Sequence, residues 1–547
     1  MIKEKNFLPQ LFILIAGIIL FFPFLGSVHL FDWDEINFAE SAREMIISGD
    51  YLNVQINYLP FWEKPPLFIW MQVLSMKLFG INEFAARFPN AIAGISTLLI
   101  LYHIGRKLYD NRFGIIWALV YAGSLLPHMY FKSGIIDPWF NLFIFLGIYY
   151  MVSYTNPDDS RNEVFNIVMS AIFIGLGINT KGPVALLLFG LTVLVWVVYS
   201  KQWKVIFNFR FLLLYILVVS IVGGLWFLLL VLKGNSYVII DFFQYQIRLF
   251  TQEDAGHGGF LLYHFVVLFI GVFPASVFAL RAFKKFTVEN GYNKLFNTWM
   301  MITFWVVLIL FTLVNTKIIH YSSMCYFPLT FFAALIIFKI IRKEISFPSW
   351  QKVLLIIMTI FVGGLLIVVQ LFIKYKDKIL ASGIIKDDFA VENMQAMVNW
   401  TGFEFLIGVI LIGGIIGSLW IFRKNMQYQI AGIFLSSIIF VNITMTIIVP
   451  RVEQYSQNAA LEFYRNISSE ECYVETWGFK SYAQYFYFNK PVPTNENSQN
   501  NDWLLTGEVD KPVYIVTKNI NANDFKELYP EFSKLYEKNG FVFFVRK

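Results

Sequence analysis

Apolar residues along the chain fall into repeated runs of about 20 residues, and short polar stretches separate these runs. A helix of that length crosses the hydrocarbon core of a bilayer. We therefore predict about 13 membrane-spanning helices. They lie near residues 7–28, 84–105, 113–131, 136–154, 165–179, 183–200, 211–232, 260–280, 297–314, 321–340, 353–373, 402–422 and 427–449.

The basic residues in the connections predict the sidedness of these helices. With the N-terminus in the cytoplasm, most connections that hold several Lys or Arg residues are cytoplasmic, whereas the short outward connections hold mostly single cations such as Lys132, Lys181 and Lys317. This asymmetry is the one that the positive-inside rule describes. It also favours two spans over 165–179 and 183–200. The long segments that then face outward are the first loop, 233–259 and 374–400.

The composition agrees with a membrane protein. Hydrophobic residues make up 57% of the 547 residues and charged residues 15%, whereas soluble domains are roughly 45–50% apolar. The net charge of +6 reflects the cytoplasmic loops, so we predict no nucleic-acid partner. Cys325 and Cys472 lie in different regions, which predicts no disulfide. The run 7–28 is too long for a signal-peptide core and lacks a small-residue cleavage site, so we interpret it as the first span.

The segment 450–547 is less apolar than the rest of the chain, and we predict that it forms a small α/β domain on the outer side. Residues 1–449 are predicted to form the membrane domain. The segment 450–547 is polar, with stretches rich in Ser, Gln and Asn. Two β-rich runs predict strands, and two amphipathic runs predict helices. The expected elements are strands at 513–517 and 541–545, helices at 461–467 and 525–535, and a loop at 494–502.

The first outward loop gathers charge in a chain where charge is scarce. Its apolar residues recur at helical spacing after Asp32–Glu35, which have capping-box spacing in the broad sense. This pattern predicts a short helix in the membrane interface, with its polar face toward water. A second interfacial helix is predicted from Leu67 to Phe79, because prolines are well placed at a helix start.

Asp34, Glu35 and Asp137 each allow a structural and a functional interpretation. Asp34 and Glu35 could simply favour a helix N-terminus, worth under about 1–2 kcal/mol. Asp137 could be an N-cap with Pro138 at the first helical position. Alternatively, Asp34 and Asp137 are outward carboxylates at one level, and Asp34 serves as a base or charge stabiliser for transfer from a lipid-borne donor.

The outward cations suggest a site for a lipid phosphate. Lys64 could extend toward headgroups as lysines often do, but it follows Glu63, precedes two prolines and opposes the positive-inside bias. A fixed ammonium in this position suits a lipid phosphate. Further polar residues in the outward turns converge at the same level, among them Lys181, Lys317, His320 and Tyr321.

The loop 233–259 leaves two interpretations open. It could be a mobile acidic loop. Alternatively, His257 binds a divalent ion such as Zn²⁺ or Mg²⁺ together with Glu63, since zinc accepts nitrogen and oxygen ligands. Few charges lie near the centres of the spans. Ion-coupled transporters need such charges, so their scarcity favours chemistry at one face over transport.

Five stretches of the sequence resemble the GT-C fold glycosyltransferases of the ArnT type, which are similar to the protein O-mannosyltransferases. The resemblance covers about residues 1–345. It lies in WDEINFAESAREMIISGDY, FWEKPPLFIWMQVLSMKLFGINEFAARFPNAIAG, DPWF, NTKGPVAL and NTKIIHYSSMCYFP. It implies 13 spans with a small periplasmic C-terminal domain in a bacterial inner membrane. It also implies a polyprenyl-phosphate sugar donor used on the periplasmic face.

The resemblance also implies roles for individual residues. Asp34 and Asp137 resemble the family's two aspartates, and Glu63 with His257 resembles its divalent-metal pair. Lys64 resembles the lysine that holds the donor phosphate, Tyr321 a tyrosine nearby, and Arg248 a phosphate contact. We group Glu35 and Lys181 with these as substrate-binding candidates. One departure is Asn37, where ArnT-type enzymes commonly have arginine three residues after the first aspartate.

These observations predict a monomeric glycosyltransferase that acts by a single inverting displacement. The reaction that the resemblance implies moves aminoarabinose from undecaprenyl phosphate to lipid A. One alternative is mannosyl or hexosyl transfer to protein or glycan hydroxyls. Two others, from different classes, are a lipid or polysaccharide transporter and a structural or sensory membrane protein.

Overall fold

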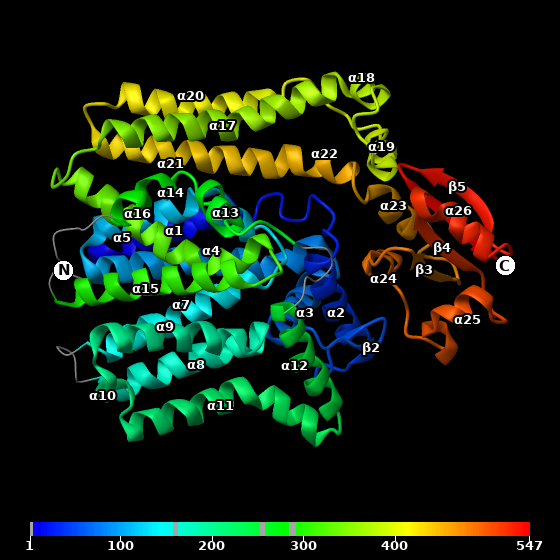
Figure 1. The fold of residues 1–547 in the computed structure, drawn as a ribbon, viewed down its shortest axis with the longest axis horizontal. Coiled ribbons are helices and arrows are strands. Elements are labelled where there is room, and N and C mark those ends of the chain that lie inside the picture. The colour runs from blue at the N-terminus through cyan, green and yellow to red at the C-terminus, as the bar shows by residue number, and fades with distance from the viewer. Residues whose placement is uncertain (1–3, 157–161, 252–257, 284–290) are drawn as a thin grey trace.

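Most helices of the chain lie side by side along its long axis, and a small sheet domain lies at one end (Figure 1). The computed structural model describes residues 4–156, 162–251, 258–283 and 291–547. The chain is a helical polytopic membrane protein with a C-terminal mixed sheet domain, which confirms the predicted fold class.

Each predicted span coincides with a helix or with two or three consecutive helical segments. Within the described residues, seven helices are long and apolar enough to cross a membrane, or eight if the pair α13–α14, bent by 110°, is one span. The others are shorter or interrupted, so about 13 crossings remains a prediction. The matching helices are α1 (Glu4–Phe21), α4 (Glu83–Leu108), α5 (Asn111–Ala122), α6 (Leu125–Tyr130), α7 (Asp137–Tyr154), α8 (Glu163–Lys181), α9 (Val184–Ser200), α11 (Phe209–Leu232), α13 (Tyr263–Gly271), α14 (Ala275–Ala279), α15 (Gly291–Leu313), α16 (Tyr326–Ile341), α17 (Ser349–Lys374), α20 (Phe405–Ile421), α21 (Met426–Ile443), η4 (Thr444–Ile448) and α22 (Val449–Gln454).

The short pair at 165–200 is two separate helices, as predicted. The chain turns between α8 and α9 at Gly182, whose φ is +89°. A side chain at this position would be strained, and its Cβ would lie 2.5 Å from the ring of Phe242. The turn therefore requires glycine and brings the adjacent Lys181 to the same end of the bundle as the first loop.

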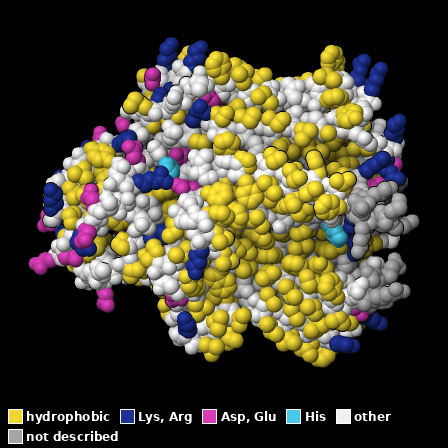
Figure 2. Space-filling model, turned by 180° about the vertical axis from the view of Figure 1, so that it is seen from behind, with side chains coloured by type: hydrophobic (Ala, Val, Ile, Leu, Met, Phe, Trp, Pro, Cys, Tyr) yellow, Lys and Arg dark blue, Asp and Glu magenta, His cyan; other side chains and the backbone are white. Residues whose placement is uncertain are grey.

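The two ends of the bundle differ in what they carry. The N-terminus and α10 (Trp203–Ile206) lie at one end, and the first-loop helices, α12 (Ser236–Thr251) and the sheet domain lie at the other (Figure 1). Hydrophobic side chains cover a broad part of the bundle between them, while many Asp and Glu lie over the sheet domain (Figure 2). The segments predicted to face outward therefore share one end. Their side of the membrane remains a prediction.

Four further short helical segments connect the longer helices of the bundle. They are η2 (Leu280–Phe283), η3 (Ile319–Cys325), α18 (Lys376–Ala381) and α19 (Asp388–Met394).

The first loop folds into a compact unit. It contains α2 (Asp34–Ser48), an antiparallel pair of short strands, β1 (Gln55–Ile56) and β2 (Leu59–Pro60), and α3 (Leu67–Phe79). The bounds of α3 confirm the predicted second helix. Its first turn follows Pro66, whose fixed φ suits a helix start.

The prediction that α2 lies in the membrane interface with its polar face toward water is wrong. Its polar face was expected to meet water, yet every residue from Glu35 to Met45 is buried. Asp32 does not cap the helix, because its Oδ1 accepts hydrogen bonds from the backbone N–H groups of Trp33 and Tyr482. The C-terminal domain thus contacts the first loop and changes the environment that local sequence spacing suggests.

The C-terminal domain is built on a four-stranded sheet in the order β3-β4-β6-β5. Strands β3 and β4 are parallel, and the other neighbours are antiparallel. The predicted strands and the first predicted helix are confirmed. The helix predicted at 525–535 is wrong over most of its length, because the helix covers Asn519–Leu528 and residues from Ser533 onward pair with β6 as strand β5. The predicted loop 494–502 contains helical turns. The elements are α23 (Asn458–Asn466), β3 (Tyr473–Trp477), α24 (Ala483–Phe488), η5 (Glu496–Gln499), α25 (Asn501–Thr506), β4 (Val513–Lys518), α26 (Asn519–Leu528), β5 (Ser533–Lys538) and β6 (Phe541–Arg546).

A buried polar network joins α2 to the C-terminal domain. The guanidinium of Arg43 donates to both carboxylate oxygens of Glu40, at 2.6 and 2.7 Å, and to the carbonyl oxygen of Lys490 at 2.9 Å. The carboxylate of Glu44 lies beside Glu40 and accepts from the backbone N–H of Tyr58 at 2.8 Å. Burial and the charge of Glu40 raise the pKa of Glu44 to about 9. Both cysteines are buried and free, as predicted.

We predict that Glu44→Gln makes the stability of the fold less dependent on pH. The folded-state pKa of Glu44 is raised, so the folded state keeps a proton that the unfolded state loses above about pH 4.3. Wild-type stability should therefore fall as pH rises toward about 9, by up to about 1.4 kcal/mol per pH unit. Thermal unfolding in detergent between pH 5 and pH 9 measures this slope. Glu462→Gln, which removes an exposed carboxylate, is the control. Equal slopes for wild type and Glu44→Gln would contradict the prediction.

Candidate active site

A cavity of about 860 Å³ lies at the end of the bundle next to the first loop. One part of its wall is apolar and comes from the helical bundle. Another part is charged and comes from the first loop, the outward turns, α12 and the C-terminal domain. The charged residues that line it are Asp32, Asp34, Glu35, Glu63, Lys64, Asp137, Lys181, Arg248, Lys317, His320 and Lys480.

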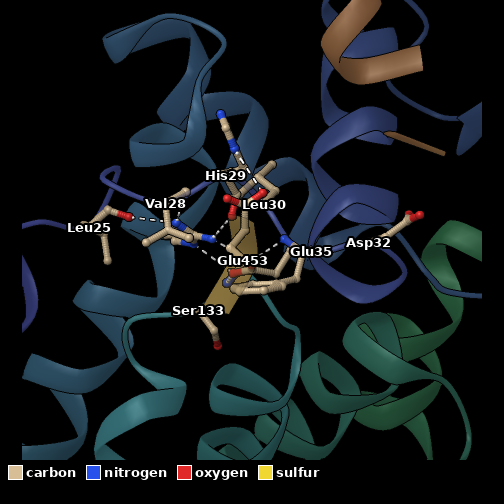
Figure 3. A network of polar contacts seen from close by, with 12 residues as sticks. Leu25, Val28, His29, Leu30, Asp32, Glu35, Ser133 and Glu453 are labelled. Carbon is tan, nitrogen blue, oxygen red and sulfur yellow. Dashed lines mark hydrogen bonds and ion pairs between the residues drawn. The ribbon is translucent and has the colours of Figure 1, made fainter. Parts of the chain in front are cut away.

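A buried ion pair holds the start of α2 at this cavity (Figure 3). The guanidinium of Arg87 on α4 donates to the two carboxylate oxygens of Glu35 at 2.9 and 2.7 Å. Glu35 also accepts hydrogen bonds from the backbone N–H groups of Phe31 and Gly134. Burial opposes the charged form, but the charge and hydrogen bonds of Arg87 outweigh it and lower the pKa of Glu35.

Arg87 extends this pair into a wider network. Its remaining N–H groups donate to the carbonyl oxygens of Leu25, Val28 and His29. His29 lies 3.2 Å from a carboxylate oxygen of Glu453 on α22. Figure 3 shows Leu25, Val28, His29, Glu35 and Glu453 close together in this network. The network therefore fixes the backbone on both sides of Asp34.

Asp34 is the first residue of α2, and its carboxylate faces the cavity. Its side chain is 44% exposed, and one oxygen lies 3.7 Å from Nε2 of His320 on η3. The helix places Asp34 beside the buried Glu35 but leaves Asp34 open. The carboxylate of Asp34 is therefore accessible to a ligand, whereas that of Glu35 is bound by the protein.

Asp137 and Lys181 form the second charged pair of the cavity. The ammonium of Lys181 donates to Oδ1 of Asp137 at 2.7 Å, and both side chains are largely buried. Asp137 is the first residue of α7 and not its N-cap, which corrects the structural interpretation made from the sequence. The same ammonium lies 5.6 Å from the ring centre of Tyr321 and 5.5 Å from that of Phe140.

Tyr245 on α12 gathers a third group of charged residues. Its hydroxyl donates to Oε2 of Glu63 at 3.2 Å. The ammonium of Lys64 and the guanidinium of Arg248 each lie 5.2 Å from the centre of its ring. Burial and the nearby charge of Lys181 lower the pKa of Lys64, against the opposing effect of Glu63, Asp34 and Asp137.

Of the two predicted metal ligands, only Glu63 has a described position. Glu63 contacts Tyr245 and lies 3.9 Å from the ammonium of Lys480. His257 lies outside the described residues. Among the residues with described positions, no group of three His, Cys, Asp or Glu side chains could hold a metal ion. The cationic neighbours of Glu63 do not make a ligand set, and we assign no chemical step to a metal.

Comparison with known proteins identifies the fold. Residues 63–226 match the model of the dolichyl-phosphate-mannose-protein mannosyltransferase family. Solved structures of ArnT from Cupriavidus metallidurans are similar over nearly the whole chain. The form bound to undecaprenyl phosphate has a TM-score of 0.77 at 17% sequence identity, covering 98% of this chain and 97% of that one. The apo form has a TM-score of 0.76. The chain has the ArnT-type GT-C fold.

Curated relatives are similar in sequence over part of the chain. The undecaprenyl phosphate-alpha-4-amino-4-deoxy-L-arabinose arabinosyl transferase of Edwardsiella ictaluri is 27% identical over 55% of this chain and 54% of its own length. A second transferase of this name, from Pseudomonas fluorescens, is 28% identical over 56% of this chain and 55% of its own length. The chain spans about half the length of these relatives in the matched region.

Within the ArnT-type fold, the described candidate residues all reach the cavity. Asp34, Glu35, Glu63, Lys64, Asp137, Lys181, Arg248 and Tyr321 line it together. Sequence reasoning missed Tyr245 and Lys480. The spacing of Val238, Phe242 and Tyr245, which are buried on one face of α12, is the helical signal that could have found Tyr245. Nothing local marks Lys480.

Lys317 lines the cavity, as expected, but its ammonium is bound by the protein. Its ammonium donates to the carbonyl oxygens of Phe311, Thr312 and Val314, at 2.6 to 3.2 Å. These bonds satisfy carbonyl groups at the C-terminus of α15, which have no partner within the helix. Lys317 thus fixes the turn that carries His320 and Tyr321.

We predict that Glu35→Gln destabilises the ArnT-type fold by about 3–5 kcal/mol, because it leaves Arg87 as a buried charge without its counter-charge. The apparent unfolding temperature in detergent should fall clearly at pH 7. Glu83→Gln is the control, since its partner Arg465 is 46% exposed and such pairs contribute little. Similar unfolding temperatures for Glu35→Gln and wild type would refute the anchoring role.

Proposed function

We propose that the chain is a glycosyltransferase that moves a sugar from a polyprenyl-phosphate donor to an acceptor at the outer face of the membrane. The observation that carries this proposal is the cavity, in which Lys64, Lys181 and Arg248 lie with the accessible carboxylate of Asp34. A similar fold in ArnT is bound to undecaprenyl phosphate. The proposed location is a bacterial inner membrane, with the N-terminus cytoplasmic and the cavity periplasmic.

The two parts of the cavity wall suit the two parts of such a donor. The cations would bind the phosphate through charge-assisted hydrogen bonds. The apolar wall would contact the first prenyl units. Its residues on the helical bundle include Phe140, Val184, Leu188, Phe311 and Val314. Tyr321 lies next to Lys181 and would contact the donor beside its phosphate.

The proposed reaction is one displacement at the anomeric carbon of the sugar. An acceptor oxygen forms the new bond to that carbon while the bond from the carbon to the donor phosphate oxygen breaks. The electron pair leaves with polyprenyl phosphate, which gains one negative charge. Lys64 and Arg248 offset this charge as it develops, which is where fixed cations contribute most to rate.

The carboxylates have separate proposed roles. Asp34 orients the acceptor, and takes its proton when the acceptor is a hydroxyl. His320 lies close enough to assist it. Asp137 positions Lys181 through their direct hydrogen bond, and Glu35 positions Asp34 through the network around Arg87.

The names of the relatives support a proposal for the sugar, and the acceptor is proposed from the sequence resemblance to ArnT-type enzymes. These names specify 4-amino-4-deoxy-L-arabinose carried on undecaprenyl phosphate, and we propose this donor, with lipid A as the acceptor. Mannosyl transfer to a hydroxyl is a second candidate, because the matching family model describes mannosyltransferases. Asn37 in place of the common arginine also allows a different sugar or acceptor.

We predict that Asp34→Asn lowers transfer at least about 100-fold, the usual scale for removing a general base or an orienting carboxylate. Purified protein, undecaprenyl-phosphate aminoarabinose and lipid A in detergent, followed by mass spectrometry of the lipid product, provide the assay. The control is Asp510→Asn on the C-terminal domain, because Asp510 accepts a hydrogen bond from the hydroxyl of Tyr473 and does not line the cavity. Full turnover by Asp34→Asn would refute its role, and no product from wild type would refute the proposed reaction.

The lowered pKa of Lys64 predicts a loss of activity on the alkaline side. The protonated ammonium binds phosphate, so donor binding should weaken as pH rises through this lowered pKa, below the range of an ordinary lysine. Lys64→Met should reduce the rate about 10²–10³-fold. Lys64→Arg should keep part of the activity and shift the alkaline limb upward, because arginine stays charged. An unchanged alkaline limb in Lys64→Arg would assign that limb to another group.

A further inference from the structure

One lysine of the C-terminal domain reaches the cavity. Among the described residues that line it, only Lys480 comes from that domain. Its ammonium lies 5.2 Å from the ring centres of Trp33 and of Tyr482, and 3.9 Å from Oε1 of Glu63. The side chain remains 50% exposed. Lys480 is therefore held between two rings while its charge stays accessible from the cavity.

Trp33 forms the other half of this surface. It is 43% exposed and lies between Asp32 and Asp34. Its backbone has a φ of 73° and a ψ of −104°, a conformation that is costly for a bulky residue. A large aromatic side chain kept exposed at such a position, next to the proposed catalytic carboxylate, indicates a role in contacting a ligand.

The position of Lys480 relative to Trp33 is fixed by contacts on either side. The backbone N–H of Tyr482 donates to Oδ1 of Asp32 at 3.3 Å. Gln457 donates to the carbonyl oxygen of Leu30 at 2.8 Å and accepts from the backbone N–H of Asp32 at 3.2 Å. These bonds join the first loop to the C-terminal domain at residues next to Trp33 and Lys480 in the chain.

We propose that Trp33 and Lys480 form the acceptor subsite, and that it binds an anionic saccharide. The aromatic face of Trp33 suits the apolar C–H face of a sugar ring, and the ammonium of Lys480 suits a phosphate or carboxylate on that sugar. This inference rests on the proposed function and adds a residue of the C-terminal domain to the machinery that selects the acceptor.

The location assigns this surface to the acceptor and not to the donor. A prenyl chain must lie along the spanning helices, whereas the C-terminal domain lies beyond the end of the bundle (Figure 1). The proposed donor cations Lys64, on the first loop, and Arg248, on α12, both lie beside the ring of Tyr245. The 3.9 Å contact between Lys480 and Glu63 is long for an ion pair, so an acceptor anion can replace it at little cost.

Native mass spectrometry of the purified full chain in detergent tests the proposal with two probes, lipid A and undecaprenyl phosphate. We expect Lys480→Gln to lower lipid A binding about tenfold or more, the scale of one hydrogen bond to a charged group, and to leave undecaprenyl phosphate binding unchanged. Lys480→Arg should restore lipid A binding. Trp33→Ala should weaken it, and Trp33→Phe should do so less. Wild type should bind dephosphorylated lipid A at least about tenfold more weakly than lipid A.

Lys511→Gln is the matched control, because Lys511 lies on the same domain, pairs with the exposed Glu471 and does not line the cavity. The inference is overturned if Lys480→Gln binds lipid A as wild type does, if it loses both probes together, or if wild type does not prefer lipid A over its dephosphorylated form. Failure of the proposed function gives a different result, since wild type would then bind no undecaprenyl phosphate and would not consume the donor.

Discussion

The buried ion pair between Glu35 and Arg87 is the interaction on which the cavity depends. It joins the first loop to α4, and the same guanidinium binds three carbonyl oxygens of the segment that enters α2. Two buried charges are costly to separate in a low-dielectric environment, so the loop has one strongly preferred position. Asp34, the residue just before Glu35, is therefore held at the cavity by its backbone although its own side chain is open.

Several other charged residues of the cavity are also held in place by hydrogen bonds to the protein. Asp137 holds the ammonium of Lys181, Tyr245 hydrogen-bonds Glu63, and Lys317 binds the carbonyl groups at the end of α15. Lys181, one of the cations proposed to bind the donor, is thus oriented before a ligand arrives. Fixed charges of this kind need little rearrangement when charge develops during a reaction, which is why they stabilise a transition state well.

The C-terminal domain is part of this arrangement. Its backbone and side chains bind Arg43, Asp32 and Leu30 of the first loop, and it covers the polar face of α2. A helix that would otherwise lie on a membrane surface becomes an internal element between two domains. The same contacts bring Lys480 to the rim of the cavity, so the domain both stabilises the loop and adds a charged group to the proposed site.

Local patterns in the sequence determined the positions of the apolar helices, the bounds of α3, and the strands β4 and β6, because hydrophobic periodicity and proline placement act within a few residues. The residue types of the first loop and the outward turns also indicated a charged outer site, since charge is scarce elsewhere. Only the tertiary structure decided that α2 is buried on its polar face, that Asp137 binds Lys181, and that Lys480 reaches the cavity. These contacts join residues between 44 and about 450 positions apart, and no local spacing encodes a contact whose energy arises only when distant segments pack together.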